Sequence, residues 1–372
     1  MTEILARLDG PRVVFTQREG RFTDAWRAAG CDVRMLDVSE PRALSGAELA
    51  AYRVRRMPEI VRANVAVLRA IRELRSAVVH CNDPGALWYA APGALAAGAQ
   101  VVLNVRDTRP DRQYGPRWRV MRHIARTIVV LSEEMRAEID SQLKPLAPFV
   151  PHADIRAIYS AVDLRRMTPV AQAIRADTRR RLGIGEREYA VAYVGTFNDK
   201  KNQLEFIERA AGPLLSSPER RLYFIGDFRP DADPYASKCR AAIERQGLSS
   251  QTSFVGFSET PHDWYRAVDA VCLASRNEGL ARAMIESLAC GTPVVSFDVS
   301  SAREILEHYD AGVVVPQGDY ATLVRELAQL EASPAERCAK GERGARAAHE
   351  LFEPERSVAR YAELYGSLSG GV

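Results

Sequence analysis

The chain of 372 residues carries a formal net charge of +3, with 27% charged and 47% hydrophobic residues. This length and balance predict a globular protein with room for two domains, and so small a net charge gives no reason to expect a nucleic-acid partner. The N-terminus has no basic start followed by an apolar run, so we expect no signal peptide. The six scattered cysteines argue against a disulfide or zinc framework and favour a reducing, cytoplasmic setting.

Short apolar runs alternate with helical stretches through the first half of the chain, which predicts a parallel sheet covered by helices. The predicted strands are residues 12–16, 32–36, 77–80, 101–106 and 127–131. A helix over 22–29 ends at Gly30, and another begins at Ser132. The weakly polar stretch 86–105 contains Pro92, so it predicts a helix followed by a strand rather than a membrane span.

Residues 52–76 form a long basic stretch with helical periodicity. Its apolar residues recur at helical spacing and predict an amphipathic helix: Ile60, Val61, Val65, Leu68 and Ile71. Its arginines fill other positions, at 53, 55, 56, 62, 69, 72 and 75. Two interpretations stay open. This surface is either a solvated face of a helix that covers the sheet, or the place where an anionic membrane or a phosphate-bearing acceptor binds.

The second half repeats the alternation after a predicted linker over residues 165–178. A helix over 177–182 precedes the predicted strands, which are residues 189–194, 222–227, 270–274 and 294–297. The strand over 189–194 ends at Gly195, and the loop that follows contains Lys200 and Lys201. A final helix is predicted over 355–368.

Residues 275–303 combine a strand end, a loop, a helix and a further strand. A helix beginning near Leu280 would point its free N–H groups at an anion, and Gly279 would let a ligand approach the backbone closely. Glu278 lies in the loop, and Glu286 lies within the helix. Carboxylates accept hydrogen bonds from hydroxyl groups, so a phosphate flanked by two carboxylates predicts a sugar-nucleotide ligand.

These residues resemble the E-x7-E signature of the retaining glycosyltransferases of family four. Its usual form is S-x-x-E-G, then five to seven residues, then E-(A/S)-(L/M)-A-x-G-x-P-V-V, and residues 275–295 fit it almost throughout. Three other segments resemble the family in the same order along the chain, namely residues 193–211, 222–227 and 255–275. The resemblance is strong over 190–330 and weak over the first half.

The resemblance implies the GT-B fold, an α/β architecture of two Rossmann-like, doubly wound parallel-sheet domains that face a central cleft. The C-terminal helix of such proteins crosses back to the first domain. We therefore expect an acceptor-side domain over residues 1–166, with 355–372 packing back on it. A domain that binds the nucleotide sugar is expected over 167–354.

Roles for individual residues follow from the same resemblance. Glu278 should hold the hydroxyls of the donor sugar, and Glu286 those of the ribose. Lys201, six residues after Gly195, should bind the diphosphate. The donor-binding set is completed by Thr196, by the backbone of Gly279, Leu280 and Ala281, and by Phe257 and Ser258 next to Gly256, where the base is expected.

Two first-domain residues complete the predicted catalytic set. Arg106 stands where many relatives of the family have a histidine, and an arginine there suits a phosphate or an acceptor anion. His80 ends a predicted strand in a segment similar to one of the family, and strand ends of such sheets face the ligand crevice. Asp231 and Asp233 imitate a metal-binding D-x-D, but we expect no metal and no other cofactor.

The predicted activity is retaining transfer of a sugar from a nucleotide-sugar donor, with a UDP-sugar preferred, to a hydroxyl of a saccharide acceptor. Residues 1–166 contain 26 lysines and arginines against 19 acidic residues, a net charge of +7. This excess predicts a lipid-linked acceptor and peripheral contact with the anionic inner face of the cell membrane. The alternatives are a soluble small-molecule acceptor, a nucleotide-binding module without catalysis, or a nucleotide-sugar epimerase of the same fold.

Overall fold

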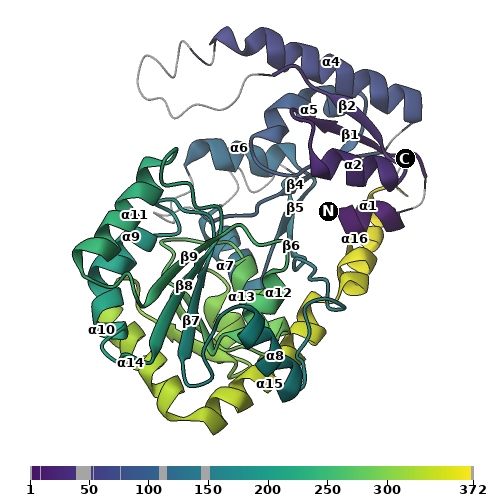
Figure 1. Ribbon diagram of the computed structural model, residues 1–372. Coiled ribbons are helices and arrows are strands. Elements are labelled where there is room, and N and C mark those ends of the chain that lie inside the picture. The colour runs from purple at the N-terminus through teal and green to yellow at the C-terminus, as the bar shows by residue number, and fades with distance from the viewer. Residues whose placement is uncertain are drawn as a thin grey trace.

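The computed structural model describes residues 2–8, 10–38, 52, 54–75, 77–108, 115–143 and 151–369. Within these ranges the chain forms two α/β domains, one built on strands β1 to β6 and the other on β7 to β12 (Figure 1). Every strand pair in them is parallel, as the alternation of strands and helices predicted. None of the described helices combines the length and apolarity that a bilayer crossing requires.

The first domain holds a two-stranded sheet, β1-β2, and a four-stranded sheet in the order β3-β4-β5-β6. Its strands are β1 Val13–Thr16, β2 Asp32–Met35, β3 Val78–Cys81, β4 Gln100–Asn104, β5 Thr127–Val130 and β6 Asp154–Ala157. Its helices are α1 Thr2–Arg7, α2 Arg21–Ala28, α4 Met57–Leu74, α5 Ala86–Ala96, α6 Pro116–Ile124 and α7 Glu133–Gln142. The side chains of β5 are all buried, as expected of a central parallel strand covered on both faces.

The buried face of helix α4 differs from the apolar face predicted for residues 52–76. Its buried side chains include Ala63, Asn64 and Ile71, whereas Val61 and Val65 point to solvent. The reason is the close approach of α5, where a Cβ on Gly93 would lie 2.3 Å from the carbonyl oxygen of Asn64. The backbone at Asn64 therefore lies against α5, whereas Val61 and Val65 are left outside.

The second domain is a single six-stranded sheet in the order β12-β11-β10-β7-β8-β9. Its strands are β7 Tyr189–Val194, β8 Arg220–Ile225, β9 Thr252–Gly256, β10 Ala270–Leu273, β11 Val294–Phe297 and β12 Gly312–Val315. Its α-helices are α8 Gln172–Arg181, α9 Gln203–Phe206, α10 Gly212–Leu214, α11 Pro234–Arg245, α12 Pro261–Ala267, α13 Arg282–Ala289, α14 Tyr320–Ala332 and α15 Pro334–Phe352. Two π-helical turns, η1 Ile207–Ala211 and η2 Arg303–Glu307, complete the domain.

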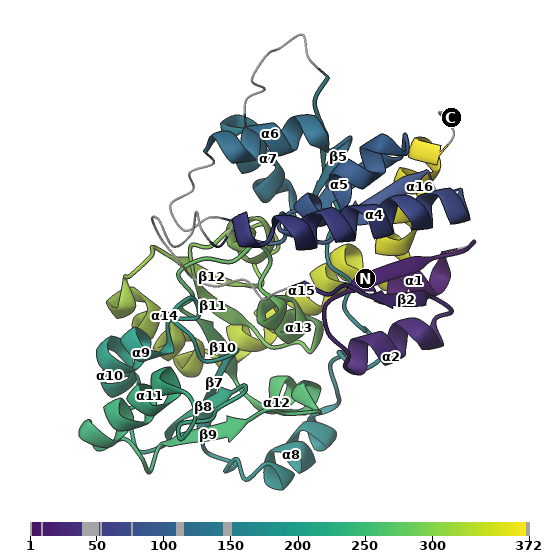
Figure 2. The ribbon, with the colours of Figure 1, turned by 90° about the horizontal axis from the view of Figure 1, so that it is seen from above.

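Helices cover both faces of this sheet, so the domain is doubly wound (Figure 2). Helices α9, α11 and α14 enclose one apolar cluster, which includes Phe206 and Leu327. Helices α12 and α13 pack on the other face, in a cluster that continues without a break into the first domain through residues such as Leu103 and Ile128. The two domains consequently share one apolar core.

The C-terminal helix α16, Pro354–Ser369, returns to the first domain, as the family resemblance implied. In Figure 1 this yellow helix lies beside α1. Tyr361 and Leu364 are buried against Val102 of β4 and Val129 of β5. The last helix of the chain thereby completes the core of the first domain.

Two predicted helix boundaries were wrong. Helix α8 begins at Gln172, inside the predicted linker, because its arginines are held by the buried carboxylate of Asp269: Arg175 and Arg179 pair with it at 2.8 and 3.1 Å. Helix α13 begins at Arg282, two residues later than predicted, since residues 279–281 run as a loop beneath the first domain. Glu286 therefore lies just over one turn into the helix.

Candidate active site

The site forms where the order of the second sheet reverses. Strands β7 and β10 are neighbours at its centre, while the strands that follow them in sequence lie on opposite sides. Ligands of open parallel sheets bind at such a switch point, outside the carboxyl ends of the strands. The loop after β7 carries Gly195 and Lys201, and the loop after β10 carries Glu278 and Gly279, so four predicted residues come together here.

Half-buried Lys201 and buried Glu278 form an ion pair at this point. The Lys201 Nζ atom lies 2.5 Å from Oε1 of Glu278, whose side chain is only 6% exposed. The aliphatic stem of the lysine passes beside Gly195, where a Cβ would lie 3.3 Å from its Cδ. Lys200, which sequence reasoning did not assign to the site, places its Nζ 3.8 Å from the other carboxylate oxygen of Glu278. The sequence signal for Lys200 was its position directly before Lys201.

The first domain meets this loop directly. A Cβ on Gly279 would lie 2.1 Å from the carbonyl oxygen of Arg106, so only glycine allows the two backbones to approach this closely. Thr108 Oγ1 donates to the carbonyl of Glu278 at 2.9 Å, and Asn277 Nδ2 donates to the carbonyl of Thr108 at 3.1 Å. Lys200 Nζ also pairs with Asp107 at 2.7 Å. The structure is thus closed over the switch point.

The backbone amides of Gly279, Leu280 and Ala281 donate no hydrogen bond to any of the residues that the structure describes. All three residues are buried, so these N–H groups are available only to something that enters the site. Amides held in this way suit an anionic oxygen.

Glu286 is oriented by its own surroundings. The Tyr265 hydroxyl donates to Oε2 at 3.1 Å, and Arg282 donates to Oε1 at 2.6 Å. Burial, and then the Glu286 carboxylate, raise the pKa of Tyr265 well above its ordinary value, so the phenol stays protonated and keeps donating. Oε1 is paired with an exposed arginine, and a carboxylate oxygen can also accept a hydrogen bond from a hydroxyl ligand.

The remaining predicted donor residues are Thr196, Phe257 and Ser258. Thr196 is exposed, and its carbonyl accepts from Gln203 Nε2 at 3.0 Å. Phe257, 59% exposed, and Ser258 follow β9, the edge strand of the sheet. The contact of these two residues with the base stays a prediction.

The two first-domain candidates differ in position. Arg106 is exposed two residues after the end of β4, and its backbone lies close to Gly279, while its Nη1 lies 3.4 Å from Oδ1 of Asn82. His80 instead faces the C-terminal helix: its Nδ1 shares a hydrogen bond with the Tyr365 hydroxyl, and its ring lies 5.7 Å from that of Tyr361. Burial lowers the pKa of His80 to about 4, so the ring is neutral at pH 7.

Other polar clusters have structural roles. Asp233 of the D-x-D sequence caps α11 by accepting from the Tyr235 amide at 2.9 Å, and Asp231 lies 3.5 Å from Arg240. Across the described ranges, no three His, Cys, Asp or Glu side chains are grouped so as to hold a metal ion.

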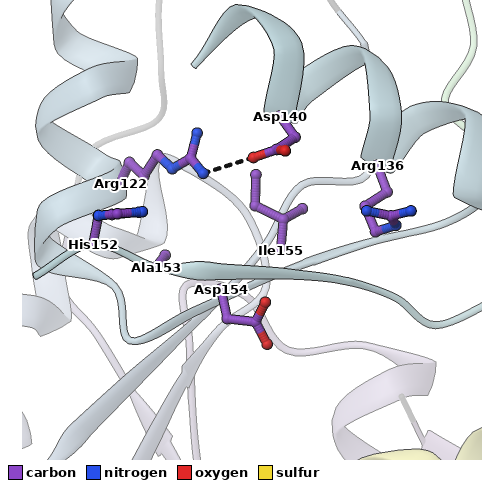
Figure 3. A pocket seen from close by; sticks show the side chains of 7 residues that line it. All are labelled: Arg122, Arg136, Asp140, His152, Ala153, Asp154 and Ile155. Atoms are coloured by element: carbon purple, nitrogen blue, oxygen red, sulfur yellow. Dashed lines mark hydrogen bonds and ion pairs between the residues drawn. The ribbon is translucent and has the colours of Figure 1, made fainter. Parts of the chain in front are cut away.

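A cavity of about 320 Å³ on the first domain lies between α6, α7 and β6 (Figure 3). Arg122 is only 6% exposed there and pairs with Asp140 at 2.6 Å. The Asp140 carboxylate neutralises the charge of Arg122, so this arginine does not provide the cavity with an unpaired cation. None of the residues that line the cavity belongs to the switch point.

The fold is that of the GT-B class, two Rossmann-like α/β domains that face each other. Residues 20–166 match the family model described as Glycosyltransferase Family 4, and residues 174–347 match the one described as Glycosyl transferases group 1. These two matches together span most of the chain. The chain belongs to the family-four glycosyltransferases.

Individual relatives agree with this membership. The chain is 32% identical over 221 residues to the lipopolysaccharide core biosynthesis mannosyltransferase LpcC of Rhizobium leguminosarum bv. viciae, covering 59% of this chain and 61% of that protein. It is 27% identical over 283 residues to the 2-deoxystreptamine N-acetyl-D-glucosaminyltransferase of Streptomyces fradiae, covering 70% and 65%. The matches thus span less than two thirds of either curated relative.

Solved structures show the same fold. The structure of Alr3699/HepE from Anabaena in complex with UDP superimposes with a TM-score of 0.80 at 18% identity, covering 98% of this chain and 94% of that one.

Proposed function

We propose that the chain is a retaining glycosyltransferase that moves a sugar from a nucleotide sugar to a hydroxyl of an acceptor. The observation that carries this proposal is the ion pair of Lys201 with the buried Glu278, beside three backbone amides that have no partner among the described residues. The lysine and the amides supply positive charge where a diphosphate would leave, and the carboxylate accepts hydrogen bonds from sugar hydroxyls.

In the proposed reaction, the bond between the anomeric carbon and the diphosphate oxygen breaks while the acceptor oxygen bonds to that carbon from the same face. The acceptor proton passes to an oxygen of the departing diphosphate. Glu278 positions the sugar, and Glu286 holds the ribose. Lys201 stabilises the leaving group, so we expect no metal requirement, and turnover in excess EDTA should equal turnover without it.

We favour a UDP-sugar as donor, which accords with the UDP-bound structure of the HepE neighbour. A thermal-shift panel of UDP-, GDP- and ADP-sugars tests this choice. Ligand at a hundredfold excess over its Kd stabilises the folded state by about 2.7 kcal/mol, so the donor should raise the melting temperature most. Equal shifts with every nucleotide sugar, or none with the UDP-sugars, would contradict it.

A nucleotide-binding module without catalysis is the second candidate, because Thr196 places no charge beside the proposed diphosphate site. Retained turnover by the purified chain alone separates the two. Binding of a nucleotide sugar with no transfer or hydrolysis, unaffected by Glu278→Gln, would favour the binding module.

We further propose a lipid-linked saccharide acceptor and peripheral association with the inner face of the cell membrane. Helix α4 supports this, because Met57, Val61 and Val65 are 53%, 55% and 39% exposed along one of its sides. Arg62 and Arg69 of the same helix are exposed beside them. Apolar side chains flanked by arginines suit the boundary between headgroups and acyl chains. Arg53, which belongs to the predicted basic stretch, lies outside the described residues.

Sedimentation with vesicles that contain anionic lipid tests the membrane proposal. Wild-type protein should pellet at low salt and be released at high salt, since salt screens the attraction. Val61→Asp should reduce the bound fraction, whereas Ile174→Asp, at a residue 55% exposed on the second domain, serves as the matched control. Protein that stays in the supernatant at low salt and glycosylates a water-soluble acceptor at full rate would favour the soluble acceptor.

A further inference from the structure

Two carbonyl groups of the loop between β10 and α13 each accept a hydrogen bond from a buried hydroxyl. Thr108 donates to the carbonyl of Glu278 at 2.9 Å, and Ser301 donates to the carbonyl of Gly279 at 2.7 Å. A peptide unit is planar, so its N–H points away from its C=O. Holding these two carbonyls therefore fixes the direction of the Gly279 and Leu280 amides, which have no partner of their own among the described residues.

The Ser301 hydroxyl connects this loop to the first domain. Its Oγ lies 2.6 Å from Oγ of Ser132, the N-cap of α7, which accepts from the Met135 amide at 3.1 Å. Each hydroxyl has one proton, and the Gly279 carbonyl can only accept. The order is therefore fixed: Met135 donates to Ser132, Ser132 to Ser301, and Ser301 to Gly279. Both serines are fully buried, at 0% exposure.

The backbone conformation of Ser301 indicates that its hydroxyl is under a functional constraint. Its φ is +71°, in the left-handed region that residues other than glycine rarely adopt. Glycine would fit this conformation without strain, and the difference between the two residues is the side chain that bonds to Ser132 and Gly279. Strain retained at a buried residue beside a ligand loop is a mark of a functional constraint.

The Glu304 carboxylate holds the first turn of α7, next to Ser132, in place. Glu304 of η2 accepts from the backbone amides of Glu133 and Glu134, at 3.2 and 2.6 Å, and bonds to the Tyr159 hydroxyl. These amides form the positive end of α7, where a carboxylate is favoured. Helix α7 of the first domain is thus attached to the second domain three residues away from Ser301.

We propose that Ser301 and Ser132 are a pair of positioning residues that orient the Gly279 and Leu280 amides, and that do so only when the two domains are together. Separation of the domains would remove Ser132 from Ser301 and Thr108 from Glu278, and the amides would lose their fixed direction. Insofar as those amides meet a diphosphate, the inference rests on the proposed function. Closure then assembles part of the leaving-group site.

Two glycine variants remove the hydroxyls while keeping the backbone. Ser301→Gly relieves the positive φ, and Ser132→Gly is suitable because glycine caps a helix almost as well as serine. Ser132→Thr keeps both cap and hydroxyl and should behave as wild type. Ser296→Ala is the control, because it removes a buried hydroxyl whose one partner among the described residues is the carbonyl of Phe297.

The first measurement is amide hydrogen exchange of residues 277–283 in the protein without any ligand. These amides should exchange faster in Ser301→Gly and in Ser132→Gly than in wild type, with no change in Ser132→Thr or Ser296→Ala. Unchanged exchange in both glycine variants would overturn the inference, whether or not the protein transfers sugar.

The second measurement is turnover of the nucleotide sugar that stabilises the wild type most. Each glycine variant should lower kcat by roughly tenfold, less than the loss of a direct oxyanion donor, and change KM by less than about threefold. The double variant should be no worse than either single one, because both remove the same connection. Additive losses would overturn the inference. Changed exchange in a protein that turns over no nucleotide sugar would instead refute the proposed function and leave the positioning role standing.

Discussion

The Lys201 ammonium lies 2.5 Å from the Glu278 carboxylate, at a point where the lysine is 19% and the glutamate 6% exposed. In this closed arrangement the cation proposed to bind the diphosphate is already neutralised by the anion proposed to hold the sugar. A donor that enters must therefore divide this pair, with the phosphates taking the lysine and the sugar hydroxyls taking the glutamate.

Lys201→Met should lower the free energy of unfolding by about 2–4 kcal/mol, because it leaves a buried carboxylate without its nearest cation. Lys201→Met combined with Glu278→Gln should recover most of that stability, since neither charge remains. Neither variant should transfer sugar at a measurable rate. Urea denaturation at pH 7.5 gives the stabilities, and equal losses in the single and double variants would show that the pair is not the cause.

Gly279→Ala should leave each domain folded but oppose closure. The added Cβ would meet the Arg106 carbonyl at 2.1 Å, a distance that requires the backbones to separate. We expect kcat to fall by roughly a hundredfold, the size of effect that loss of an oxyanion-type donor produces. Gly366→Ala is the control, because a Cβ on that residue of α16 would meet nothing within 4 Å. Small-angle scattering should show a larger radius of gyration for Gly279→Ala only; an unchanged radius with full activity would contradict the role of this contact.

His80 should contribute a pH dependence to stability. Burial lowers its pKa from 6.5 to about 4, so the unfolded chain binds this proton at a higher pH than the folded one. The contribution is complete above pH 6.5 and is lost as the pH falls from 6.5 to 4, by about 3 kcal/mol. His80→Phe keeps a ring against Tyr361 and Tyr365 but cannot titrate.

Urea titrations at pH 7.5 and 4.5 check this expectation. Wild type should lose more stability between these two values than His80→Phe does, and the difference isolates His80 from the carboxylates that also titrate. The same loss in both proteins would mean that the histidine is not buried in its neutral form. Sugar transfer by His80→Phe decides separately whether the predicted catalytic role holds.

Asp269 should be among the most sensitive acidic positions for folding. Its carboxylate, 6% exposed, pairs with Arg175 and Arg179 and accepts from the Ala190 amide at 2.9 Å. Asp269→Asn should cost about 3–5 kcal/mol, because it leaves the buried Arg179 and the partly exposed Arg175 without their anion. Asp177→Asn breaks an exposed pair with Arg180 and should cost less than about 1 kcal/mol. Similar losses in the two variants, measured by urea denaturation, would contradict this account.

The sequence alone predicted those features that depend on a local pattern of residues. Strand β7 was predicted to the residue, because Tyr189 to Val194 is an unbroken apolar run that ends at a glycine. Lys201 and Glu278 were predicted as partners of one ligand through the family resemblance, and the structure brings them into contact.

What depends on packing between distant segments was not predictable. The start of α8 depends on Asp269, which lies 94 residues after Arg175. The exposed valines of α4 depend on how closely α5 approaches. The contacts of Thr108 and Ser301 with the loop depend on the relative orientation of the domains. No periodic pattern in the sequence encodes that orientation.

The return of α16 to the first domain has a consequence during synthesis. Tyr361 and Leu364 fill a core whose other members include Ile4, Val102 and Ile158. At roughly 5–20 residues per second, the ribosome needs on the order of 10–40 s to proceed from Ile158 to Leu364. For that interval the apolar groove beside β4 and β5 has no helix to cover it. A chaperone that binds nascent apolar segments should therefore be captured on ribosomes stalled before residue 361, and released once the last helix has emerged.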